Sequence, residues 1–121
     1  MESNHVISIF AALAQATRLE VFRLLIAHEP EGLAAGDIAK QLDVPHNTMS
    51  THLAILSKAG LIEARRRSQS VIYRARLEAV EALVGYLLKE CCGGRPEIRA
   101  SLAGRLLPLL AEMGQRDEGR S

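Results

Sequence analysis

Residues 36–60 read GDIAKQLDVPHNTMSTHLAILSKAG, and the apolar residues in this segment follow a helical spacing. Ile38 and Leu42 lie four residues apart, about one helical turn, so a short helix is predicted over Gly36–Leu42. A tight connection follows, and its last residue, Pro45, suits the first position of a new helix. Two helices joined by a short turn are therefore expected here.

The second helix of this pair is predicted over Pro45–Ala59, with Gly60 as its C-terminal stop. Met49, Leu53 and Leu56 form its buried stripe, and the opposite face carries small polar side chains. A helix fits the major groove of DNA, where such side chains reach base edges. The alternative is a face that only contacts water. The residues expected to contact DNA from this helix are His46, Asn47, Thr48, Ser50, Thr51 and Lys58.

The hydrophobic period changes after the helix pair. Two short strands are predicted over Ile62–Arg66 and Ser70–Ala75, joined by a turn. Because successive residues of a strand point to opposite faces, Arg65 and Arg67 share one direction and Arg66 takes the other. The hairpin residues expected to contact DNA are Arg65, Arg67 and Gln69.

Helices are also expected on either side of this central part. Thr17 and Glu20 have the spacing of a capping box, which predicts a helix start. The apolar face of that helix is predicted to hold Leu19, Phe22, Leu25 and Ile26. Further helices are predicted over residues 4–14 and 77–90 and from Pro96 onward, with a kink at Pro108.

Length and composition describe an ordinary globular chain. It has 121 residues, of which 48% are hydrophobic and 24% charged, and it lacks an apolar run of about 18 residues. Two cysteines do not make a disulfide framework, and the N-terminus lacks the pattern of a signal peptide, so a cytoplasmic protein is expected. The expected organisation is one DNA-binding and dimerisation domain over residues 1–114, then a polar tail over 115–121.

The net charge of +1 conceals a strong segregation. Residues 46–76 hold six Lys or Arg against one Glu, which gives +5, whereas residues 1–45 sum to −3 and residues 77–121 to −1. Such a basic segment favours a polyanionic partner, with a solvated basic face as the alternative. Within it, Arg74 and Arg76 are expected to pair with Glu78 or Glu81.

The order of elements predicts a mainly α chain with a small β-hairpin, which is the arrangement of a winged helix-turn-helix. Residues 11–25 (AALAQATRLEVFRLL) and 36–74, including MSTHLAIL and SVIYR, resemble the arsenic-repressor (ArsR/SmtB) family of bacterial metalloregulators. The resemblance covers about residues 5–92. It implies a homodimer built on the first and last long helices, which binds an inverted repeat in double-stranded DNA and represses an operon until an effector binds. It does not imply a membrane partner.

His52 lies in the recognition-helix signature, where it either faces DNA or serves as a buried or inter-helix hydrogen bonder. An enzyme is not expected, because no Ser/His/Asp set, phosphate loop or paired carboxylates stand out. A winged helix used only for protein contacts is a further alternative, which the +5 segment disfavours.

Cysteines 91 and 92 are the expected effector site. The family's Cys-x-Cys positions are Ala34 and Gly36 here, and residues 74–90 lack the His and Asp of its zinc site. A disulfide between adjacent residues is strained, whereas two thiolates suit one soft ion. The resemblance to an arsenic-sensing subset, through ECCGG at 90–94, implies that trivalent arsenic or antimony binds Cys91 and Cys92 as effector, with no obligatory cofactor.

That subset places a third cysteine six or seven residues further on, where this chain has Ile98 and Arg99. The third ligand is then an exogenous thiol, water or a cysteine of the partner subunit. Alternatively, the effector is a monomethylated arsenical, which needs only two sulfurs. The alternative is that Cys91 and Cys92 form a thiol-redox or persulfide sensor.

Overall fold

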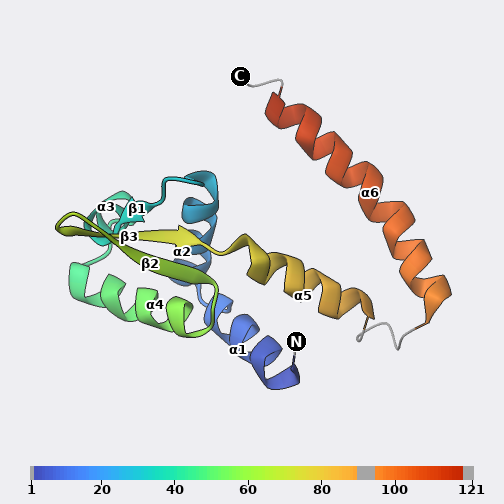
Figure 1. The fold of residues 1–121 in the computed structure, drawn as a ribbon, viewed down its shortest axis with the longest axis horizontal. Helices are drawn as coiled ribbons and strands as arrows, with labels where there is room; N and C mark the ends of the chain where they lie inside the picture. Colours follow the sequence, from blue (N-terminus) through green and yellow to red (C-terminus); the bar gives the residue numbers. More distant parts are fainter. Residues whose placement is uncertain (1, 90–94, 119–121) are drawn as a thin grey trace. The chain divides into compact units, whose positions relative to one another are not determined.

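The computed structural model describes residues 2–89 and 95–118, and its mainly helical chain with a small antiparallel sheet confirms the predicted fold class (Figure 1). The chain divides into two compact units, residues 1–83 and 84–121. The elements are α1 (Ser3–Leu13), α2 (Ala16–Ala27), β1 (Leu33–Ala34), α3 (Ala35–Leu42), α4 (His46–Lys58), β2 (Ile62–Arg67), β3 (Ser70–Ala75), α5 (Leu77–Lys89) and α6 (Pro96–Glu118).

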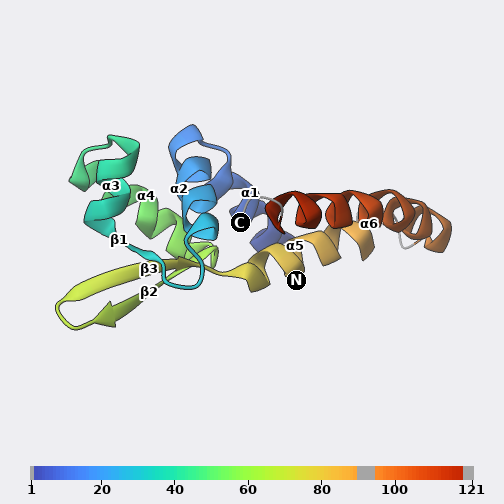
Figure 2. The same ribbon diagram turned by 90° about the horizontal axis from the view of Figure 1, so that it is seen from above.

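The core of residues 1–83 is mainly aliphatic, and Phe22 is its buried aromatic residue. Helices α2, α3 and α4 lie on one side of the sheet (Figure 2). Each of these helices buries one stripe against it, and the strands contribute their inner faces. The fully buried large side chains are Ile9, Val21, Leu25, Ile38, Met49, Leu53, Leu56, Leu61 and Ile62.

The sheet has three strands in the order β1-β3-β2, all antiparallel. The hairpin of β2 and β3 was predicted, but β1 was not. β1 pairs Leu33 with Tyr73 and Ala34 with Ile72. Gly32 before it has φ 76°, and a Cβ there would overlap the Tyr73 carbonyl oxygen, so this approach of β1 to β3 requires glycine.

The predicted start of α2 is wrong. Gln15 is the N-cap, with φ −154° and ψ 132°, and its side-chain oxygen accepts a hydrogen bond from the Arg18 backbone N–H at 2.8 Å. Thr17 is therefore already inside the helix. Glu20 pairs with Arg23 at 3.2 Å instead of closing a capping box.

The predicted inner face of α2 is also partly wrong. Phe22 and Leu25 are buried as expected, together with Val21, whereas Leu19 and Ile26 are 44% and 39% exposed. Starting the helix at Ala16 does not explain this difference. The buried stripe is narrower than the predicted one and includes Val21 in place of the two outer residues.

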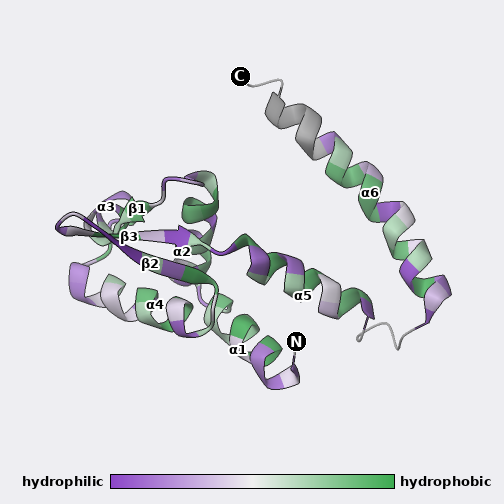
Figure 3. Ribbon diagram, viewed as in Figure 1, coloured by the Kyte–Doolittle hydropathy of each residue, from purple (hydrophilic) through white to green (hydrophobic). Residues whose placement is uncertain are grey.

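Several large apolar side chains in the described part of the chain are exposed. Figure 3 shows hydrophobic residues along α1, α5 and α6. Ile7 is 63% exposed and Phe10 is 46% exposed on α1. Helix α6 includes Pro108, and the predicted kink there stays a prediction. No helix in the described part of the chain is long and apolar enough to cross a membrane. On α5 and α6 the exposed residues are Leu77, Val80, Val84, Leu87, Leu106, Leu107, Leu109 and Leu110.

Candidate nucleic-acid interface

The turn between α3 and α4 is fixed by backbone geometry. Asp43 takes a left-handed conformation with φ 53°, and the following N–H, of Val44, bonds to the Ala39 carbonyl oxygen at 3.0 Å. Pro45 is the N-cap of α4, so the helix begins one residue later than predicted. The carbonyl oxygen of Pro45 accepts a hydrogen bond from the Met49 N–H at 2.9 Å, which opens the helix.

The inner face of α4 sets which of its side chains reach solvent. Met49, Leu53 and Leu56 are at most 1% exposed, so the predicted buried stripe is confirmed. This packing turns the opposite face outward. All six α4 residues that were predicted to contact DNA are exposed: His46, Asn47, Thr48, Ser50, Thr51 and Lys58.

The hydroxyl groups on this face are oriented by their own helix. The Ser50 hydroxyl donates to the His46 carbonyl oxygen at 3.0 Å, and the Thr51 hydroxyl donates to the Asn47 carbonyl oxygen at 3.4 Å. Each hydroxyl oxygen then has lone pairs left to accept from an outside donor. The surface therefore offers acceptors as well as the charge of Lys58.

His52 does not belong to this outward face. It is half-buried, and its Nδ1 lies 3.4 Å from Nη1 of Arg18 on α2. The interpretation of His52 as an inter-helix hydrogen bonder is confirmed. Because the Arg18 guanidinium can only donate, Nδ1 of His52 is the acceptor in this contact.

The β2–β3 hairpin carries the second group of predicted residues. Arg65, Arg67 and Gln69 are all exposed, and the turn places Ser68 at φ 58°. β2 continues to Arg67, one residue beyond the predicted strand. The hairpin tip lies at the same end of residues 1–83 as the N-terminal turn of α4 (Figures 1 and 2).

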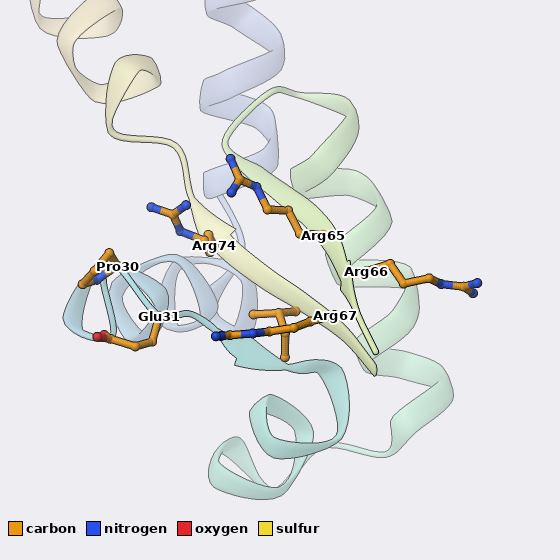
Figure 4. A pocket seen from close by; sticks show the side chains of 7 residues that line it. Pro30, Glu31, Arg65, Arg66, Arg67 and Arg74 are labelled. Carbon is orange, nitrogen blue, oxygen red and sulfur yellow. The ribbon is translucent and has the colours of Figure 1, made fainter. Parts of the chain in front are cut away.

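The predicted alternation of the arginines is visible in Figure 4, where Arg66 and Arg67 point to opposite sides of the hairpin. Nε of Arg65 lies 3.7 Å from a carboxylate oxygen of Glu63 on the same strand. Residues two apart on a strand share a face, so Glu63, Arg65 and Arg67 project from one side of β2.

Arg74 of β3 pairs differently from the prediction. Its Nη2 donates to Glu29 at 3.1 Å, and its Nη1 lies 4.0 Å from Glu63. The hydrogen bond with Glu29 raises the pKa of Arg74 above its ordinary value, against the effect of burial. Arg76 does pair with Glu78, at 3.8 Å, as expected.

The partners Glu29 and Arg18 were missed because their contacts span 45 and 34 residues of sequence. Local spacing carries no signal for such pairs. Arg66, exposed on the hairpin between two predicted DNA contacts, was also left out of the predicted set. The charge of residues 46–76 was the signal that could have included it.

The predicted effector residues Cys91 and Cys92 lie outside the described residues. Within residues 2–89 and 95–118, no cluster of three or more His, Cys, Asp or Glu side chains is arranged to hold a metal ion. Ile98 is half-buried and Arg99 is exposed in the first turn of α6. Just before them, Arg95 donates to Glu97 at 2.7 Å; a backbone N–H and then Arg95 lower the pKa of that carboxyl.

This fold, with a polar helix face and a basic hairpin at one end, defines a winged helix-turn-helix DNA-binding protein. A model of a helix-turn-helix domain family matches residues 13–65. The arsenic resistance transcriptional regulator ArsR1 of Pseudomonas putida is 36% identical over 110 residues, which cover 91% of this chain and 80% of that protein. The chain belongs to the ArsR family of winged helix-turn-helix transcriptional regulators.

Other relatives agree with this assignment. The transcriptional activator HlyU of Vibrio cholerae is 29% identical over 94 residues, covering 76% of this chain and 84% of that protein. An ArsR-like transcriptional regulator from Rhodococcus sp. RHA1 superposes with a TM-score of 0.63 at 26% identity, over 88% of this chain and 90% of the other. These relatives are transcriptional regulators and not enzymes.

A solved domain from Mycobacterium bovis, described as a homodimeric winged helix-turn-helix DNA-binding domain, superposes with a TM-score of 0.56. It is 29% identical and covers 71% of this chain and 83% of that domain. The fold of the DNA-binding part is thus shared with a protein solved as a dimer.

Proposed function

We propose that this ArsR-family regulator is a homodimeric repressor that binds an inverted-repeat operator through α4 and the β2–β3 hairpin. Trivalent arsenic or antimony, bound by Cys91 and Cys92, releases it from that operator. The observation that carries the DNA-binding part is the exposure of all six predicted α4 residues on a helix held by Met49, Leu53 and Leu56.

The two exposed surfaces support different roles on DNA. Ser50, Thr51 and Asn47 present small polar groups that suit base edges in the major groove. Arg65, Arg67 and Gln69 extend from the hairpin as contacts to phosphates or to the minor groove. His46, Thr48 and Lys58 complete the α4 surface.

The exposed apolar residues support a dimer. Ile7 and Phe10 on α1 and Val84 and Leu87 on α5 stay in contact with water in one copy of the chain. Burying them against a second copy is favourable. The two recognition helices of the dimer then bind half-sites whose separation is about one DNA turn, or a multiple of one turn. Light scattering that shows a monomer at micromolar concentration, still binding DNA tightly, would contradict this part.

The chemistry of the two cysteines supports a soft trivalent ion as effector. Thiolate sulfur prefers soft ions, and Cys91 and Cys92 are the only cysteines of the chain. The relative from Pseudomonas putida, 36% identical, is an arsenic resistance regulator. Release requires that the ion bind the DNA-incompetent state of the protein more tightly than the DNA-competent state.

The second candidate is a thiol-redox or persulfide sensor with the same DNA-binding surface. Ile98 and Arg99 favour it, because they replace the third thiolate that three-sulfur coordination of arsenic needs. A two-thiol site is sufficient for persulfide chemistry or for a monomethylated arsenical.

One titration separates these candidates. The protein bound to labelled operator DNA is titrated with arsenite, antimonite, methylarsenite, zinc and persulfide, and release is followed by fluorescence anisotropy. Release by the trivalent arsenicals or antimonite, and not by zinc or persulfide, is the expected result. Release by persulfide alone would assign the sensor function instead.

A further inference from the structure

The outer face of the sheet gathers arginines from two strands. Arg67 faces Ser70 across the strand pair, Arg65 faces Ile72, and Glu63 faces Arg74. Residues opposite each other in an antiparallel pair project to the same side. Arg65, Arg67 and Arg74 therefore share one face, while Ile62 and Ala75 on the other face are buried in the core.

These arginines border a pocket of about 350 Å³. Its other wall is the connection between α2 and β1, and in Figure 4 the Arg67 side chain reaches across the sheet toward Glu31 of that connection. Arg74 and Arg65 lie along the opposite part of the rim. The pocket is lined by Pro30, Glu31, Arg65, Arg66, Arg67, Ile72 and Arg74.

The charges of the pocket are only partly balanced. Glu29 orients Arg74 at 3.1 Å, and Glu63 lies 3.7 Å from Arg65. In the described part of the chain, neither Arg66 nor Arg67 has an ion-pair partner. Three guanidinium groups, those of Arg65, Arg67 and Arg74, thus share the pocket's face of the sheet, whereas that of Arg66 points to the other side of the hairpin (Figure 4). Glu31 is the one carboxylate among the lining residues, and Glu29 and Glu63 position Arg74 and Arg65 from outside.

We propose that this pocket is a binding site for a phosphate group. The planar fork of a guanidinium matches phosphate oxygens, and several arginines at strand spacing can contact one group from different sides. Arg67 supplies the uncompensated charge, and Ile72 and Pro30 supply an apolar wall beside it. The phosphate comes from a small molecule or from the backbone of bound DNA; the DNA source rests on the proposed function, and the small-molecule source does not.

The test follows inorganic phosphate on the full-length, isotope-labelled protein by NMR, with sodium chloride at equal ionic strength as the control. Saturable shifts of the backbone amides of Gly32, Arg67 and Ile72 are expected with phosphate only. Arg67→Gln is expected to weaken binding about tenfold or more, as for a lost charge-assisted hydrogen bond. Arg105→Gln, which removes the same charge from exposed α6, is the matched control and leaves phosphate binding unchanged.

Shifts that do not saturate, or that chloride reproduces, would overturn the proposal. So would equal phosphate affinity of the Arg67→Gln and Arg105→Gln proteins, both shown to be folded by thermal melting. A second titration, with operator DNA added to the phosphate-loaded protein, separates the sources of the group. Loss of the phosphate-dependent shifts assigns the pocket to a DNA phosphate, whereas their persistence assigns it to a small phosphorylated molecule.

Discussion

Nη1 of Arg18 on α2 lies 3.4 Å from Nδ1 of His52 on the recognition helix α4. The same guanidinium donates through Nε to the Ala12 carbonyl oxygen at 2.5 Å and through Nη2 to that of Ala11 at 3.4 Å. One side chain therefore joins the end of α1, the start of α2 and the middle of α4. This junction fixes the orientation in which α4 presents its outer face.

Replacing Arg18 should destabilise the protein more than replacing an ordinary surface arginine. Arg18→Met is expected to lower the free energy of unfolding by about 2 kcal/mol, because the Ala12 carbonyl oxygen and His52 lose a charged donor. The matched control is Arg23→Met on the same helix, whose exposed pair with Glu20 should be worth less than about 0.5 kcal/mol. Urea denaturation measures both values, and equal losses would show that Arg18 is not a structural junction.

Alanine substitutions at Gly32 and Gly36 should change the stability of the protein in opposite directions. Gly32→Ala is expected to cost about 2 kcal/mol or more, because its φ is positive and the added Cβ meets the Tyr73 carbonyl and the Arg74 side chain. Gly36→Ala lies in α3 with open space around it and should stabilise the protein by about 0.5 kcal/mol. Thermal melting of the two variants tests this contrast, and a neutral Gly32→Ala would show that β1 is not held tightly against β3.

Spacing along the sequence predicted the elements that form the DNA-binding part. Met49, Leu53 and Leu56 repeat at helical spacing, so α4 and its outward face followed directly. The strand β1 could not be predicted in this way, because its two residues have no period and depend on pairing with β3. The spacing of Thr17 and Glu20 predicted a capping box, whereas the N-cap of α2 is Gln15.

Substitutions in the basic hairpin and in the polar face of α4 should have different effects on DNA binding. Arg67→Ala should weaken binding to all DNA sequences and flatten the dependence of log affinity on log salt by about one unit, as for a lost phosphate contact. Asn47→Ala or Ser50→Ala should instead change the preference among operator variants. Fluorescence anisotropy over a salt series measures both effects. If neither substitution changes affinity, the interface has been misplaced.

A third thiolate should strengthen arsenite binding. Ile98→Cys or Arg99→Cys places a cysteine in the first turn of α6, at the spacing that the resemblance to the arsenic-sensing subset implies for a third thiolate. Arsenite should then release DNA at a lower concentration than in the parent chain, while methylarsenite, which needs two sulfurs, should change less. Ile98→Ser is a control that alters the same position without adding a thiol. An unchanged arsenite midpoint in both cysteine variants would argue against a shared site with Cys91 and Cys92.

The assignment of Cys91 and Cys92 as the sensor is tested by arsenite release of operator DNA from the parent chain and from the double variant Cys91→Ser, Cys92→Ser, followed by fluorescence anisotropy. Both proteins should dimerise and bind DNA with nearly equal affinity, because the substituted thiols are distant in sequence from α4 and the hairpin. Arsenite should release the parent chain and leave the double variant bound. Full release of the double variant by arsenite would contradict the assignment of the two cysteines as the sensor.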